Sequence, residues 1–128
     1  MKKEILITMF LILSVCKLFS ADPVDRVDKN IAFTRLSDKT YLIQSSYSSN
    51  GLLDCNLLLI LDTKDVVLVN TPSTDSLTTI LLNCIEKKFK RKVTRVIVSH
   101  FHDDSAGGLT VTNNLVSLRT DWIKQGIC

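Results

Sequence analysis

Histidine is scarce in this chain, since its 128 residues include only two, His100 and His102. Cysteine is also little used: past the N-terminal segment it occurs only as Cys55, Cys84 and Cys128, and no two of these have CxxC spacing. An odd, scattered set of cysteines is not a disulfide framework, and without CxxC a cysteine-rich zinc ribbon is excluded. We expect Cys84 to lie in the core.

A strong charge of either sign is lacking too. The net charge is +3, and much of the basic excess lies in "KKFKRK" (87–92). Without a basic stripe or interleaved aromatic residues, this argues against nucleic acid as a partner. These cations instead suit the C-terminus of a helix. The composition, 45% hydrophobic and 23% charged, is that of a globular protein, and the length allows at most one domain.

The first 21 residues resemble a secretory signal peptide. Met1-Lys2-Lys3 is a short positive segment, and residues 5–15 form an apolar run that is too short to span a bilayer. We therefore expect residues 1–21 to be a signal peptide and the rest of the chain to reach the bacterial periplasm or to be secreted, with no stable membrane span. The cleavage position stays open, because small residues occur at more than one suitable place.

Short apolar runs dominate the first half of the remaining chain. They predict four strands, of which the first two form a hairpin: 31–36, 39–45, 55–62 and 66–71. A polar loop, 46–54, separates the second from the third. Because the later runs are continuously apolar, we expect both of their faces to be buried.

The period then changes to that of an amphipathic helix. Apolar residues recur at helical spacing from Leu77 to Phe89, Pro72 is expected to end the preceding strand, and Ser73 or Thr74 can cap the helix. A buried strand (93–100) follows, then a second helix from about residue 106. A strand–helix–strand unit of this kind predicts the α/β class, with helices layered on a sheet.

Both histidines lie at the end of that last strand, in "SHFHDDSAGG" (99–108). Residues two apart on an extended segment project to the same side, so His100 and His102 can bind one zinc ion. Asp104 can turn toward a second metal, whereas Asp103 points elsewhere. Gly107 and Gly108 would let the backbone turn tightly and let the next helix pack closely.

HxHxD followed by two glycines, after an apolar strand and an amphipathic helix, resembles the metallo-β-lactamase superfamily. The resemblance covers about residues 30 to 115. Many relatives carry HxHxDH, but here Ser105 follows Asp104, so the pattern is similar to subclass B1, the secreted zinc β-lactamases.

The resemblance implies the N-terminal half of an αβ/βα sandwich and a site for zinc (Zn²⁺), with two ions in a complete domain. One zinc would take three histidines, among them His100 and His102. The other would take an aspartate, a cysteine and a histidine, the aspartate being Asp104, which is also the expected catalytic residue. The implied substrate is a β-lactam, a small molecule, and a complete domain would be a monomer.

Further residues acquire roles only through the resemblance. The loop 46–54 corresponds to a flap over the substrate, with Tyr47, Leu52 and Leu53 as its apolar face. Asn70 stands where the family has an aspartate that supports the ligands by hydrogen bonds, and the two glycines after the motif would also support the site.

Two histidines cannot complete the implied ligand set, and Cys128 lies in the wrong place for the missing cysteine. We therefore expect residues 22–128 to be a partial domain whose C-terminal half is missing, with little or no activity. One alternative is another hydrolase of the same fold, such as a thioesterase-like or glyoxalase-like enzyme. Another is a non-catalytic remnant or a module that depends on a partner.

Overall fold

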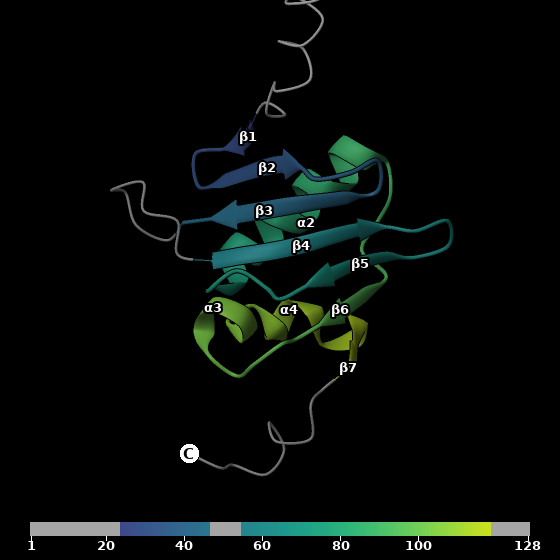
Figure 1. Cartoon of the computed structure of the whole chain (residues 1–128). Coiled ribbons are helices and arrows are strands. Elements are labelled where there is room, and N and C mark those ends of the chain that lie inside the picture. The colour runs from purple at the N-terminus through teal and green to yellow at the C-terminus, as the bar shows by residue number, and fades with distance from the viewer. Residues whose placement is uncertain (1–23, 47–54, 119–128) are drawn as a thin grey trace, which may run out of the picture.

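The computed structural model describes residues 24–46 and 55–118 of the chain (Figure 1). Within these ranges the strands form one mixed sheet of seven, in the order β1-β2-β3-β4-β5-β6-β7. The predicted signal peptide, the flap residues Tyr47, Leu52 and Leu53, and Cys128 lie outside the described residues. The α/β class with helices layered on a sheet is confirmed.

The first five strands form an antiparallel meander: β1 (Asp25–Asp28), β2 (Ile31–Arg35), β3 (Thr40–Ser45), β4 (Cys55–Leu61) and β5 (Val66–Val69). The hairpin expected from the sequence is β2–β3, in which Phe33 lies opposite Ile43. Strand β1 was not predicted, because Val27 is its only apolar residue. It pairs with β2 at the edge of the sheet, where charged residues are common.

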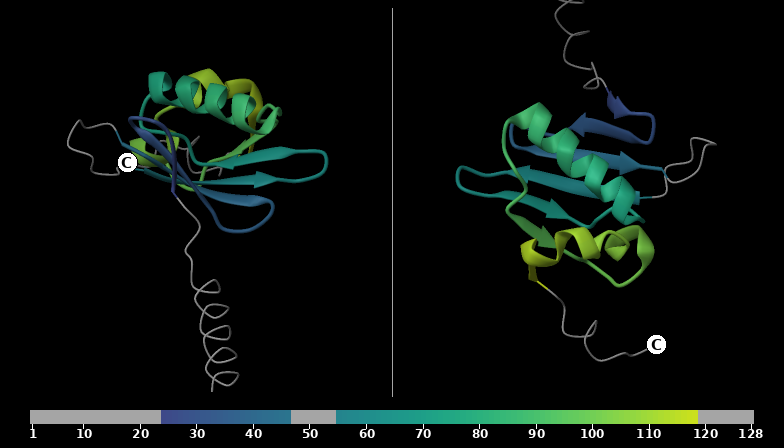
Figure 2. Two further views of the ribbon diagram at one scale, coloured as in Figure 1. Left: turned by 90° about the horizontal axis from the view of Figure 1, so that it is seen from above. Right: turned by 180° about the vertical axis from the view of Figure 1, so that it is seen from behind.

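The rest of the sheet is parallel. Helix α2 (Asp75–Phe89) leads from β5 to β6 (Arg95–Ile97). After β6 come α3 (Asp103–Ala106), α4 (Leu109–Thr112), the 3-10 turn η2 (Asn113–Leu115) and β7 (Val116–Leu118). Both β5–β6 and β6–β7 are parallel pairs, so the expected strand–helix–strand unit is confirmed. Seen from behind, α2 lies across the strands (Figure 2).

Local signals in the sequence define both ends of α2. At the start, the Thr74 hydroxyl accepts a hydrogen bond from the Leu77 N–H at 3.2 Å, so Thr74 rather than Ser73 is the cap. At the other end, Lys90 adopts a left-handed conformation with φ 56°, and its N–H bonds to the Glu86 carbonyl at 2.9 Å. Lysines in the last turn complement the helix dipole, as the basic run suggested.

The core lies between α2 and one face of the sheet. Alternate strand residues point to it, and Leu81 and Ile85 of the helix pack on them. Cys84 is partly buried at its edge, close to where it was expected. The fully buried aliphatic residues of the sheet include Ile31, Ile43, Leu59, Val66, Leu68 and Val96.

The opposite face of the sheet is also apolar but only partly buried. Leu58, Ile60, Val67 and Val69 point to it, since side chains alternate along a strand, and each keeps some exposure within the described residues. The expectation of two buried faces is therefore wrong for these strands as described. Only the face toward α2 is closed.

The boundaries nearest the histidine segment differ from the prediction in three places. Strand β5 ends at Val69 instead of residue 71, because Asn70 has φ 67°, a left-handed conformation that a strand does not contain. Strand β6 ends at Ile97, before the histidines. The second helix was expected from about residue 106, but α3 begins at Asp103, and Gly107 and Gly108 separate it from α4.

In residues 24–46 and 55–118, no helix has the length and apolar character needed to cross a membrane.

Candidate metal centre

The histidine segment lies beside the end of β5. Since β5 and β6 are parallel neighbours, with Val69 opposite Ile97, the residues that follow them emerge at the same edge of the sheet. Asn70 therefore contacts Ser99, although 29 residues separate the two. Sites of α/β proteins commonly lie beyond the carboxyl ends of strands.

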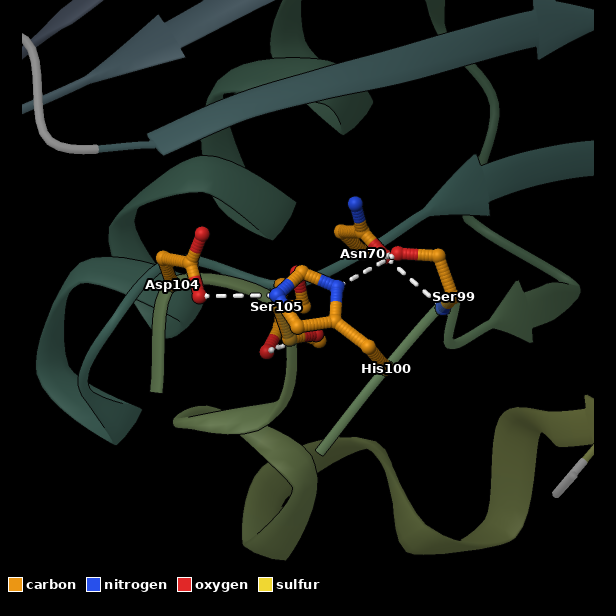
Figure 3. A network of polar contacts seen from close by, with 6 residues as sticks. Asn70, Ser99, His100, Asp104 and Ser105 are labelled. Atoms are coloured by element: carbon orange, nitrogen blue, oxygen red, sulfur yellow. Dashed lines mark hydrogen bonds and ion pairs between the residues drawn. The ribbon is translucent and has the colours of Figure 1, made fainter. Parts of the chain in front are cut away.

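Three side chains converge there. Ligand atoms of His100, His102 and Asp104 all lie within 4.8 Å of one another. The two imidazole rings are nearly perpendicular, with centroids 5.2 Å apart. His100 Nε2 lies 3.1 Å from Asp104 Oδ1 (Figure 3). The structure thus brings together the three residues that the sequence proposed as metal ligands.

The backbone explains how Asp104 reaches His100. His102 is extended, with φ −69° and ψ 157°, and it is the residue immediately before α3. Asp104 lies in the first turn of that helix, so the chain folds back and the pair closes across four residues. Asp103, in the same turn, is exposed and is not part of the group, as the sequence suggested. The catalytic role of Asp104 stays a prediction.

Asn70 acts on the site through a residue that the sequence analysis missed. Its side-chain oxygen accepts hydrogen bonds from the Ser99 N–H at 2.9 Å and the Ser99 hydroxyl at 2.8 Å. The Ser99 Oγ lies in turn 2.9 Å from His100 Nδ1. The only signal in the sequence was the position of this serine directly before the first histidine.

A second buried connection holds the segment between Asp104 and the glycines. The Thr71 N–H bonds to the Ser105 carbonyl at 2.9 Å, and the Thr71 hydroxyl accepts the Gly108 N–H at 2.9 Å. Thr71 is 0% and Ser105 1% exposed. The Ser105 hydroxyl also lies 2.9 Å from His100 Nδ1. Thr71, two residues past β5, therefore anchors the metal loop, residues 99–108, on two sides of its turn.

Gly107 and Gly108 serve close packing. Their φ angles, −63° and −103°, lie in regions open to any residue. A Cβ at Gly107, however, would lie 2.5 Å from the Ser73 carbonyl carbon, and one at Gly108 would lie 2.6 Å from Thr78 Cβ. The predicted close approach is present, toward α2 and the residue before its cap, and it requires no special turn conformation.

The three side chains fit a zinc ion in chemistry and nearly in spacing. Imidazole nitrogens and a carboxylate oxygen are ordinary zinc ligands, at about 2.0–2.2 Å from the metal, so two ligands of one ion lie at most about 4.4 Å apart. The ligand atoms of His100, His102 and Asp104 lie within 4.8 Å of one another, which is slightly more than this maximum. His102 and Asp104 are exposed, so small rotations of their side chains would close this gap.

Comparison with known proteins agrees with this geometry. A metallo-β-lactamase type 2 of Bacteroides fragilis is 31% identical over 86 residues, which are 66% of this chain and 34% of that protein. One of Bacillus cereus is 35% identical over 80 residues, which are 62% of this chain and 31% of that protein. A search against protein-family models gave no match.

A solved structure resembles the fold. The metallo-β-lactamase from Pontibacter korlensis superposes with a TM-score of 0.58 and 25% identity, over 65% of this chain and 39% of that one. The chain spans about a third of the length of the two curated relatives that it matches, 34% and 31%. The likeness therefore concerns one part of such proteins.

Proposed function

We propose that this chain, which belongs to the metallo-β-lactamase superfamily, carries the metal-binding loop of a zinc-dependent hydrolase that opens the β-lactam ring. The observation that supports this most is the convergence of His100, His102 and Asp104 beyond the ends of β5 and β6. The relatives are named for the same activity.

Each residue of the group would have a defined task. His100 and His102 would hold one zinc ion through unprotonated ring nitrogens, and the Asp104 carboxylate would bind that ion or a neighbouring one. When bound, zinc lowers the pKa of a coordinated water and so supplies a nucleophile near neutral pH. Because His102 and Asp104 are exposed, a small substrate can approach the group.

We further propose that this chain turns over β-lactams slowly or not at all by itself. Its 128 residues contain two histidines, fewer than the ligand set that the family resemblance implies. We also propose export to the periplasm, on the strength of the apolar N-terminal segment.

Zinc binding tests the first proposal. Affinity would be measured at pH 7.5 by competition with a chromophoric chelator, for the full chain and two variants. We expect the unaltered chain to bind, and His102→Ala to bind at least about tenfold more weakly, because a ligand is lost. The control, Asp103→Asn, removes a neighbouring exposed carboxylate outside the group and should bind like the unaltered chain. Equal binding by all three, or none by the unaltered chain, would contradict the proposed metal site.

Substrate choice needs a separate assay. Hydrolysis of nitrocefin and of a simple thioester would be followed with zinc added. Slow nitrocefin turnover that disappears in His102→Ala supports the β-lactamase assignment and argues against a non-catalytic remnant. Preference for the thioester would instead favour another hydrolase of the superfamily.

A further inference from the structure

The ring of His102 lacks the polar contacts that surround the ring of His100. The His100 ring lies at hydrogen-bond distance from oxygens of Ser99, Asp104 and Ser105. In residues 24–46 and 55–118, by contrast, no side chain or backbone group forms a hydrogen bond or an ion pair with the ring of His102. Metal-binding histidines are usually oriented by a hydrogen bond to their second nitrogen. The orientation of His102 therefore depends on other contacts within this part of the chain.

Two aromatic rings contact His102. The Phe101 ring centroid lies 4.4 Å from that of His102, with the planes inclined at 59°, and the His100 centroid lies 5.2 Å away at 86°. Aromatic pairs prefer tilted or edge-to-face arrangements with centroids about 4.5–7 Å apart, so both contacts are attractive. Phe101 is the nearer of the two rings, at about the lower limit of this range.

Phe101 is not part of the hydrophobic core. It is 49% exposed, and it does not belong to the cluster of residues that joins α2 to the sheet. Single exposed apolar residues are normal on a protein surface, and Leu36 and Val111 are others in this chain. Phe101 differs from them because its ring packs on a proposed metal ligand. Replacing it should therefore affect that ligand more than the stability of the fold.

The backbone of His102 is already fixed by α3. Its carbonyl accepts hydrogen bonds from the N–H groups of Ser105 and Ala106, each at 2.9 Å, and its φ and ψ are −69° and 157°. Rotation about the side-chain bonds is the freedom that remains, and exposed side chains readily exchange between staggered rotamers. The Phe101 ring occupies space beside the imidazole and so limits this exchange.

The orientation of His102 that this contact holds is suited to metal binding. In it, ligand atoms of His100, His102 and Asp104 lie within 4.8 Å of one another. A side chain held near its bound orientation loses less rotamer freedom when a ligand binds. We propose that Phe101 is a positioning residue, whose ring holds the imidazole of His102 toward His100 and Asp104. This inference rests on the proposed metal site and adds to it a residue that does not bind the metal itself.

The rotamer of His102 can be read without any metal. Three-bond couplings between its Hα and Hβ protons report χ1, and ring-current shifts of its C–H protons report the contact with Phe101. Both would be recorded on the full, metal-free chain at one fixed pH, with a His100→Gln variant to assign the signals, since the sequence has only two histidines. We expect one rotamer in the unaltered chain and in Phe101→Tyr, which keeps the ring. We expect averaging between rotamers in Phe101→Leu, which keeps only the apolar character.

Zinc affinity gives the second measurement. We expect Phe101→Leu to bind zinc about three- to tenfold more weakly, the effect expected from the loss of one aromatic pair, and Phe101→Tyr to bind like the unaltered chain. The control, Leu36→Ala, removes another exposed apolar side chain, in the β2–β3 turn, and should change neither the couplings of His102 nor the affinity. The midpoint of urea unfolding should change little in any of these variants, because both positions are about half exposed.

The outcomes separate the role of Phe101 from the metal site. Averaged His102 rotamers in the unaltered chain, a single rotamer in Phe101→Leu, or a zinc affinity that Phe101→Leu leaves unchanged would overturn the role of Phe101. Equal losses of affinity in Phe101→Leu and Phe101→Tyr would do the same, since the ring would then not matter. A single rotamer in the unaltered chain without any zinc binding would overturn the metal site instead, on which this role depends.

Discussion

Replacing Thr71 with valine tests the anchor of the metal loop. Valine has nearly the shape of threonine but lacks the hydroxyl that accepts the Gly108 N–H at 2.9 Å. The Ser105 carbonyl keeps its bond from the Thr71 N–H, also at 2.9 Å, so one buried donor, the Gly108 N–H, loses its partner. Leaving a buried polar group unpaired costs about 1–3 kcal/mol. We expect the free energy of unfolding to fall by that amount.

A serine at the same position is the matched control. Thr71→Ser keeps the hydroxyl and removes one methyl group from a fully buried site, which costs about 1 kcal/mol. Urea unfolding of metal-free protein, followed by far-ultraviolet circular dichroism, would measure both variants. The valine variant should be less stable than the serine variant. If valine costs under about 0.5 kcal/mol, or less than serine, the hydrogen bond does not hold the loop as we argue.

Three further predictions concern stability and reactivity. Gly108→Ala should lower stability by about 1–3 kcal/mol in urea unfolding, because the new methyl group would lie 2.6 Å from Thr78 Cβ on a rigid helix; an unchanged midpoint would contradict this packing. Leu59→Ala should cost about 2–5 kcal/mol and its neighbour Leu58→Ala clearly less, since Leu59 is fully buried and Leu58 points to the open face; equal losses would mean that both faces are closed. Burial raises the pKa of the Cys84 thiol, the charge of Asp28 raises it further, and the charge of Lys87 offsets part of this. Mass spectrometry should therefore show slower alkylation of Cys84 by iodoacetamide at pH 8 in folded than in unfolded protein. Equal rates would refute the protected thiol.

The parts of the fold that the sequence predicted are those with strong apolar periodicity. Helix α2 has apolar residues at helical spacing, and strands β2 to β5 are short apolar runs. The existence and order of these elements were therefore predictable. Strand β1 was missed because its polar residues show no pattern, and its pairing with β2 depends on the rest of the sheet. The early end of β5 was missed because the left-handed Asn70 follows from contacts with Ile97 and Ser99.

The grouping of the three proposed ligands was predictable from the sequence, whereas the residues that support them were not. His100, His102 and Asp104 are close in sequence, and their spacing alone suggested one zinc ion for the two histidines and a neighbouring metal for Asp104. Thr71 and Ser99, by contrast, act across strands that are distant in sequence, and threonine and serine are too common to signal a function. Of the two roles predicted for the glycines, the close packing is present, but the backbone turn does not need glycine; the surface on which they pack, at Ser73 and Thr78, required the structure.

The long-range hydrogen bonds that support the metal loop join the segment after β6 to the two residues that follow β5. The bond from Ser99 to Asn70 spans 29 residues and that from Gly108 to Thr71 spans 37. Once β5 and β6 have paired around α2, both ends of these bonds are already in place, and assembling the loop requires no further long-range chain closure. Pairing of the two strands and formation of the site should therefore be one event in folding. In hydrogen exchange, the amides of Ser99 and Gly108 should open together with the β5–β6 pair as a single cooperative unit.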